Sequence, residues 1–265
     1  MPNTSRTDDT AAMIPSVLVV RAIHLADLRD ALAEGWKDFR ETPTHLLFLS
    51  AIYPVIAFAA AIAARKGNLI ELFYPLVAGL SLMGPLVSVG IYELSRRREL
   101  GLQVSWVNAF DIFRSPSIYS IAYLAPLMCL IFVAWLLAAD MIYQMTLGKM
   151  TPSSVGDFLR LTFTTKSGWY LIMFGNLVGF IFAALVLTLT VVSFPLLVDR
   201  NVGPIVAMQT SIRAVRANPI TMSVWGVIVA AGLLLGCLPL FIGLAVILPV
   251  LGHATWHLYR RVVVH

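Results

Sequence analysis

Two histidines near the carboxyl end, His253 and His257, have a spacing that could support metal chemistry. Residues four apart share one face of an α-helix, and imidazole pairs at this spacing can ligate zinc, copper or haem iron. A metal site needs further ligands, and Glu93 is the best candidate because it aligns with His257 in an internal repeat. The alternative is an interfacial band, in which these histidines lie with Trp256 and Tyr259 among lipid headgroups.

Other signals of catalysis are missing from the sequence. It contains no P-loop, no HExxH, no GxSxG and no Ser-His-Asp order. Ionisable residues inside a bilayer usually mark ion or proton pathways. Here Glu71, Glu93 and Asp140 fall at the ends of apolar segments, whose centres carry no charge. We therefore expect no enzymatic activity and no cofactor, with metal or haem at the histidine pair as the alternative.

The elements that position these residues must be membrane helices. Of the 265 residues, 59% are hydrophobic and 12% are charged, against about 45–50% and about 25% in soluble domains. The mean hydropathy is +0.84. These values exclude a soluble enzyme, a nucleic-acid binder and a disordered chain. The net charge of +5 comes from basic residues beside apolar blocks, where an anionic membrane leaflet attracts them.

Six apolar segments are predicted to cross the membrane. A span needs about 20 residues to cross a hydrocarbon core of about 30 Å. The first four segments are residues 45–64, 69–94, 117–139 and 169–198. Residues 221–258 are long enough for two spans, with a turn at 236–239, where Gly and Pro occur. The predicted fold class is therefore all-α, with six transmembrane helices.

The orientation follows from the positions of Lys and Arg, which favour the cytoplasmic side. With the amino terminus inside, the inner segments carry 14 of the 19 basic residues. We expect a multi-pass protein of the bacterial inner membrane with both termini in the cytoplasm. The longest outer loop, residues 140–167, is predicted to contain a short surface helix that starts near residues 152–154.

An internal repeat is indicated by three similar segments. Each segment combines an amphipathic stretch, a basic residue and a proline ahead of a span, and the three are residues 33–43, 106–116 and 210–219. Residues 85–97 also align with residues 249–261 without gaps. We predict a disordered cytoplasmic tail over 1–20 and one membrane domain over 21–265. Its three tandem units, each an interfacial helix plus a transmembrane hairpin, would cover residues 28–98, 103–200 and 205–261. The alternative is that all membrane hairpins share such prolines and arginines.

The amphipathic segments are expected to lie in the headgroup plane. They either dock a partner or cover the ends of the spans, and we favour the structural role. The residues of this interfacial motif are Gly35, Trp36, Asp38, Asn218, Pro219 and Trp256.

The fourth predicted span carries a packing motif. Gly175 and Gly179 form a GxxxG, which allows helices to approach closely. Asn176 is the deepest polar side chain of the predicted spans. We expect it to hydrogen-bond across helices in a polar core rather than to bind a substrate.

Several of these motifs resemble a known family. They are the Gly-Trp-Lys-Asp-Phe run at 35–39, residues 193–200, Asn218-Pro219 and residues 248–261. From about Val20 to its end, the chain resembles a bacterial family of predicted integral membrane proteins, domain of unknown function 2189. The resemblance implies no activity, although some members carry a label linking them to cytochrome c oxidase subunit I. A haem–copper core needs several deep histidines, and this chain has only five His in total.

Together these features predict a non-enzymatic structural or accessory membrane protein. Its expected partners are the lipid bilayer and another membrane protein complex, for which a respiratory complex is one example; no nucleic acid is expected. The alternative is a small permease or lipid-handling transporter for an uncharged or amphipathic solute. Prolines that interrupt the predicted spans favour that alternative, because broken helices occur in transporters.

Overall fold

A computed structural model of the chain describes residues 18–42, 70–150, 152, 154–239 and 241–264. Over these residues the chain is helical apart from loops and one isolated bridge between Val20 and Val263, which confirms the all-α prediction. The α-helices are α1 (Leu25–Glu41), α3 (Ile70–Leu82), α4 (Gly84–Val87), α5 (Val89–Glu99), α6 (Ile118–Thr146), α7 (Val155–Thr164), α8 (Lys166–Thr190), α9 (Ser193–Asp199), α10 (Pro204–Ala217), α11 (Pro219–Cys237) and α12 (Leu244–Val262). A 3₁₀ helix, η1, covers Trp106–Arg114.

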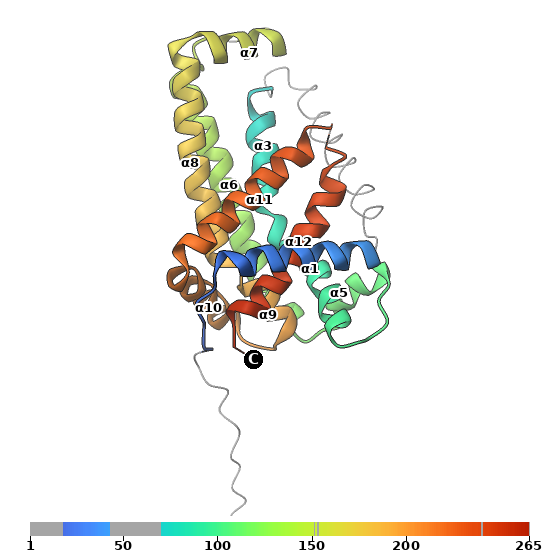
Figure 1. The fold of residues 1–265 in the computed structure, drawn as a ribbon. Helices are drawn as coiled ribbons and strands as arrows, with labels where there is room; N and C mark the ends of the chain where they lie inside the picture. The colour runs from blue at the N-terminus through green and yellow to red at the C-terminus, as the bar shows by residue number, and fades with distance from the viewer. Residues whose placement is uncertain (1–17, 43–69, 151, 153, 240, 265) are drawn as a thin grey trace, which may run out of the picture.

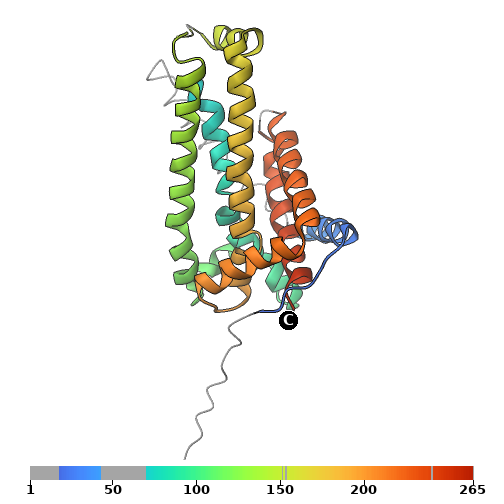
Figure 2. The same cartoon turned by 90° about the vertical axis from the view of Figure 1, so that its left-hand side faces the viewer.

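Three helical segments of the described chain are long and apolar enough to cross a membrane. They are α6, the continuous segment Lys166–Asp199 formed by α8 and α9, and α11. These helices confirm the predicted spans at 117–139 and 169–198 and the first half of 221–258. α11 ends within the predicted turn at 236–239. Figures 1 and 2 show α6 and α8 standing side by side as the two longest rods of the molecule.

The predicted span over 69–94 is wrong as a single helix. The chain breaks at Met83 and Ser88 into α3, α4 and α5. Pro85 explains the first break, because proline lacks an N–H and its ring clashes with the carbonyl four residues earlier. α5 is not apolar along its length, since it ends in Arg96, Arg97 and Arg98.

The count of six spans is not confirmed by the described residues. The first predicted span, 45–64, lies outside them. α12 covers the second half of 221–258, but its second half holds two histidines and two arginines, and it does not qualify as a span by length and composition. Most of the predicted tail, residues 1–17, also lies outside the described residues.

The two ends of the bundle differ in character. At one end α7 lies across the tips of α6 and α8 (Figure 1). The Ser154 side chain caps α7 by accepting the Asp157 backbone N–H at 3.1 Å, which confirms the predicted surface helix. At the opposite end α1, α5, α9, α10 and the last turns of α12 gather (Figure 1). We call this the polar end.

Each of the three predicted interfacial segments falls on a helix. One of these helices precedes the undescribed residues 43–69, and the other two precede the longer apolar helices α6 and α11. The three segments lie on α1, η1 and α10. The order of elements therefore fits the proposed repeat. The boundaries at 28–98, 103–200 and 205–261 remain a prediction.

The crossing of α1 over α12 depends on a glycine. A Cβ atom added to Gly35 would lie 2.6 Å from the backbone nitrogen of Ala254 and 2.7 Å from its Cβ. Ala254 is fully buried. The sequence thus brings α1 and α12 into backbone contact at this point, and any side chain at residue 35 would push them apart.

We expect Gly35→Ala to lower the thermal stability of the protein in detergent. Overpacking a tight contact costs about 1–3 kcal/mol, because neither backbone can move away without disturbing the polar contacts beside it. Gly156→Ala in α7 is the control, since its Cβ would meet only the Ser154 Oγ, at 3.9 Å. Melting temperatures that are equal for the two variants would contradict the close approach.

Candidate functional site

The carboxylate of Asp38 joins three helices at the polar end. From α5, Arg98 Nε donates to Asp38 Oδ1 at 2.9 Å, and Ser95 Oγ donates to Oδ2 at 2.8 Å. From α12, His257 Nε2 lies 2.8 Å from the same Oδ2. Asp38 is buried, with 6% of its surface exposed. We call the residues around it the α1–α5–α12 cluster: Glu34, Asp38, Ser95, Arg98, His253, His257 and Arg261.

A second histidine extends the cluster through the serine. Ser95 Oγ lies 2.7 Å from His253 Nδ1. Because the serine hydroxyl donates its hydrogen bond to Asp38, the serine oxygen accepts a hydrogen bond from the His253 Nδ1–H. His253 is completely buried, and its Nε2 has no hydrogen-bond partner within the described residues. The order of donation is therefore His253 to Ser95 to Asp38.

His257 lies between two carboxylates. Its Nε2 faces Asp38, and its Nδ1 lies 3.1 Å from Glu34 Oε2. Only the doubly protonated imidazolium donates at both nitrogens. Glu34 also accepts two bonds from Arg261, at 2.8 and 3.0 Å. Such bidentate, charge-assisted pairs are among the stronger hydrogen bonds in proteins.

These contacts shift the acidity of the two carboxyls on α1. The hydrogen bond from Arg261 is the largest influence on Glu34, and it lowers the pKa of this carboxyl below its ordinary 4.5. Burial raises the pKa of Asp38. The hydrogen bond and charge of His257 and the bond from Ser95 outweigh burial, so the net pKa lies below its ordinary 3.8. Both groups are therefore carboxylates at neutral pH.

The cluster lines a cleft of about 440 Å³, together with Lys37, Glu99 and Arg260. Arg260 pairs with Glu99 at 2.6 Å and with Asp199 of α9 at 3.2 Å. The indole Nε1 of the buried Trp256 donates to Glu99 Oε2 at 3.1 Å. The positive and negative side chains of the cleft are thus largely paired with one another.

A separate contact fixes the amino-terminal segment to the polar end. The amide of Asn218 accepts from the Ile23 N–H at 2.7 Å and donates to the Arg21 carbonyl at 3.1 Å. The Arg21 N–H in turn donates to the Val262 carbonyl at 2.9 Å. Asn218 also precedes Pro219, the first residue of α11. One amide therefore connects the start of the described chain to α11.

The interfacial-motif residues thus differ in their surroundings. Gly35, Asp38, Asn218 and Trp256 make the tertiary contacts described above, whereas Trp36 is 46% exposed. Sequence reasoning missed Glu34, Ser95 and Arg98. The Arg96–Arg98 run is visible in the sequence, where it indicates the orientation of the chain and enters the repeat alignment, but it does not point to Asp38.

The structure brings together part of the predicted metal site. His253 and His257 meet at Asp38 rather than at Glu93. Glu93 is buried and accepts two bonds from Arg96, at 2.7 and 2.9 Å. No group of three or more His, Cys, Asp or Glu side chains in the described part of the chain is placed to hold a metal ion. The Glu93 carboxylate is paired with Arg96 on its own helix. The prediction that Glu93 is a third metal ligand is therefore corrected.

The meeting of Asp38, Ser95 and His253 does not have the order of a catalytic triad. In acyl transfer, histidine removes the serine proton while the aspartate holds the other ring nitrogen. Here the serine lies between the two, gives its proton to the aspartate and is completely buried. This arrangement suits the joining of helices rather than attack on a substrate.

The predicted polar core at Gly175, Asn176 and Gly179 needs correction. Only Gly179 faces another described helix, where its Cβ would lie 3.3 Å from the Trp135 ring of α6. A Cβ at Gly175 would meet nothing within 4 Å. Asn176 is exposed and donates to the Ile172 carbonyl of its own helix at 2.7 Å. The helical period separates Asn176 from the face that packs on α6.

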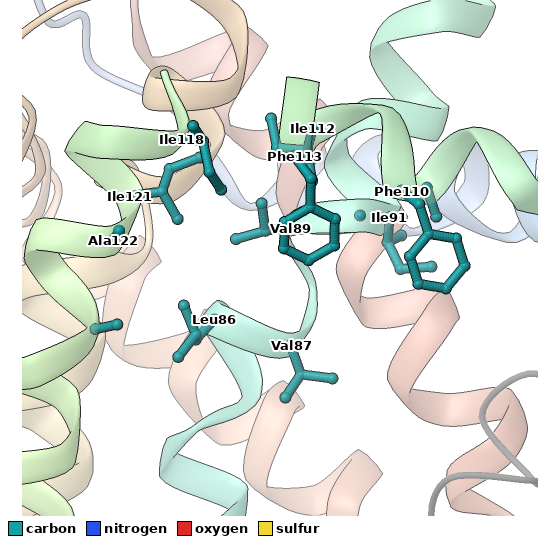
Figure 3. A pocket seen from close by; sticks show the side chains of 13 residues that line it. Leu86, Val87, Val89, Ile91, Phe110, Ile112, Phe113, Ile118, Ile121 and Ala122 are labelled. Atoms are coloured by element: carbon teal, nitrogen blue, oxygen red, sulfur yellow. The ribbon is translucent and has the colours of Figure 1, made fainter. Parts of the chain in front are cut away.

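An apolar pocket of about 430 Å³ lies between α4, α5, η1 and α6. Figure 3 shows Leu86 and Val87 from α4 facing Phe110 and Phe113 from η1 across this space, with Ile118 and Ile121 of α6 along one side. All thirteen residues that line the pocket are apolar.

Comparison with known proteins adds one match. Residues 73–199 match the model of a family described as predicted integral membrane protein, DUF2189. Over this segment, which is just under half of the chain, the sequence is similar to that family. The match, together with the three apolar helices, confirms an integral membrane protein. No curated protein and no solved structure matches the chain.

The matched segment of the DUF2189 family extends from α3 to the end of α9. It therefore includes Ser95 and Arg98 but none of α1 or α12. The partners of those two residues, Asp38, His253 and His257, lie on either side of the match.

We expect the stability of the protein to fall in acid because of Glu34 and Asp38. Both have lowered pKa values in the folded protein, so their contribution is complete above the ordinary values of 4.5 and 3.8. It is lost as the pH falls through the lower folded values. Melting temperature should therefore be constant above the ordinary pKa of 4.5 and drop as the pH falls below it.

Asp38→Asn should reduce this acid dependence and lower stability at pH 7 by about 1–3 kcal/mol, because Arg98 and His257 lose their charged acceptor. Asp30→Asn is the matched control, since Asp30 is half exposed and pairs with the exposed Arg29. An Asp38→Asn variant with the wild-type pH profile would contradict the role of Asp38.

Proposed function

We propose that the protein is a non-enzymatic structural or accessory protein of the bacterial inner membrane. In this proposal the chain has six spans, both termini lie in the cytoplasm, and no cofactor is needed. The membrane partner is another integral protein complex, for which a respiratory complex is one candidate. Basic residues at the polar end, among them Arg98 and Arg261, support its cytoplasmic placement.

The observation that carries this proposal is the internal pairing of the α1–α5–α12 cluster. Its buried serine and paired charges hold α1 across the ends of α5 and α12. A substrate site would need polar groups that remain available, whereas the polar groups of this cluster, apart from the buried His253 Nε2, already bind one another. The cluster thus supports a rigid surface rather than a reaction.

The surface that the cluster holds in place is the outer side of α1. Trp36, Lys37 and Arg40 are exposed there, and an aromatic residue beside basic ones suits a headgroup layer or the acidic rim of a membrane partner. A surface fixed by buried ion pairs binds without first being ordered, which lowers the entropic cost of association.

We expect crosslinking in native membranes, followed by purification in mild detergent, to recover a membrane protein partner in fixed ratio. Lys37→Glu should reduce this recovery several-fold without changing the melting temperature, because it reverses an exposed charge. Arg160→Glu on α7, at the opposite end, is the control. Isolation of the protein alone under all these conditions would contradict the accessory role.

The apolar pocket favours lipid handling as a second candidate function. It is lined only by apolar side chains and has a volume typical of small-ligand sites. Its position beside η1, whose Trp106 and Phe113 are exposed, suits a lipid acyl chain that enters from the bilayer.

If this second candidate is correct, Ala122→Trp should fill the pocket and reduce the lipid retained after purification several-fold. Ala122 lines the pocket on α6. Leu130→Trp is the matched control, because Leu130 is 65% exposed on the same helix and does not line the pocket. Native mass spectrometry measures the bound lipid. Equal retention by both variants would contradict lipid handling through this pocket.

A further inference from the structure

The outer face of α8 is a broad apolar surface. Its exposed residues include Trp169, Met173, Asn176 and Phe180. These four share one side of the helix, since they are spaced three or four residues apart. In Figure 2, which turns this side toward the viewer, α8 stands in front of the bundle, and no other described helix crosses its upper half.

Asn176 is the polar exception on this face. It lies ten residues beyond Lys166, the first residue of α8, which places it about 15 Å along the helix. Counted from Trp169 instead, Asn176 lies about 10 Å along the helix, which is well inside a hydrocarbon core of about 30 Å. The exposed Trp169 and Tyr170 lie nearer the start of the helix, where aromatic residues mark the membrane surface.

The hydrogen-bonding capacity of Asn176 is only partly used. A carboxamide has two N–H donors and an accepting oxygen. One donor binds the Ile172 carbonyl, at 2.7 Å. Within the described residues no hydrogen bond to its oxygen is found. Hydrocarbon supplies no partner, and an unpaired polar group there is costly. The face therefore needs a neighbour with a polar group at the same depth.

We propose that α8 is the interface of a parallel homodimer, in which Asn176 pairs with Asn176 of a second copy. Every copy enters the membrane in the same orientation, so a two-fold axis along the membrane normal puts identical residues opposite each other at equal depth. A carboxamide is self-complementary, because each can donate to the oxygen of the other. A lipid tail cannot meet this requirement.

The residues around Asn176 suit such a contact. Met173 and Phe180 lie one turn before and one turn after it, and are 53% and 70% exposed. Ala183, two turns after Asn176, is small and exposed, so the two helices can approach closely below the asparagine pair. Phe174, 43% exposed, lies toward the other edge of the exposed arc.

Disulfide crosslinking in native membranes tests the geometry. Single cysteines are introduced at residue 173, 180 or 174 in the full-length Cys129→Ala/Cys237→Ala background. Under oxidation, Met173→Cys and Phe180→Cys should give covalent dimers, and Phe174→Cys should give several-fold less. Equal yields at all three positions, or no dimer at any, would overturn the proposal.

Substitution of the asparagine tests its role. Asn176→Leu should weaken dimerisation in detergent by about three- to thirty-fold, the range known for polar contacts between membrane helices. Asn176→Gln keeps the carboxamide and should retain most of the dimer. The leucine variant remains apolar, and an unchanged melting temperature at high dilution confirms that the monomer is folded. A leucine variant that dimerises like the wild type, or a monomeric wild type, would refute the pairing.

Discussion

A carboxylate removed from water must be matched by donors, and Asp38 is matched from two other helices at once. Arg98 and Ser95 reach it from α5, and His257 reaches it from α12. The cost of burying this charge is offset only when all three helices are in place. The arrangement of the helices at the polar end follows from the need to pair the Asp38 carboxylate. α1 lies across α12 closely enough to require Gly35, and α5 turns away from the path of a simple membrane span.

The same condition shapes the chemistry of the site. The groups that sequence motifs associate with metals and catalysis, namely His253, His257 and Ser95, are used here as donors and acceptors in one network. His257 bridges Asp38 and Glu34. The apolar pocket beside η1 and the outer face of α8 differ from this network in composition. Their side chains are mainly apolar and make few polar contacts within the described residues. Polar pairing thus holds the framework, whereas these two surfaces are mainly apolar.

The sequence predicts the apolar helices well and the polar end only in part. α6, α8 and α11 follow from length and hydropathy, because lipid exposure imposes a uniform apolar composition. The break of 69–94 was missed because proline inside a membrane segment is compatible with either a kink or a stop. Asp38 and the histidines were singled out, but their partners Ser95 and Arg98 were not. Asp38 and Ser95 are 57 positions apart, and their contact depends on how their helices cross. The hydrophobic periodicity of a sequence does not indicate how its helices cross.

The pairing of the two ends of the described chain has a consequence for biogenesis. The bridge between Val20 and Val263, and the packing of α1 against α12, join an early segment of the described chain to a late one. While the ribosome is still translating the middle of the protein, α1 can meet α5 but not α12. Asp38 and Glu34 therefore gain His257 and Arg261 as partners only once α12 has been made, so the polar end is completed late in synthesis.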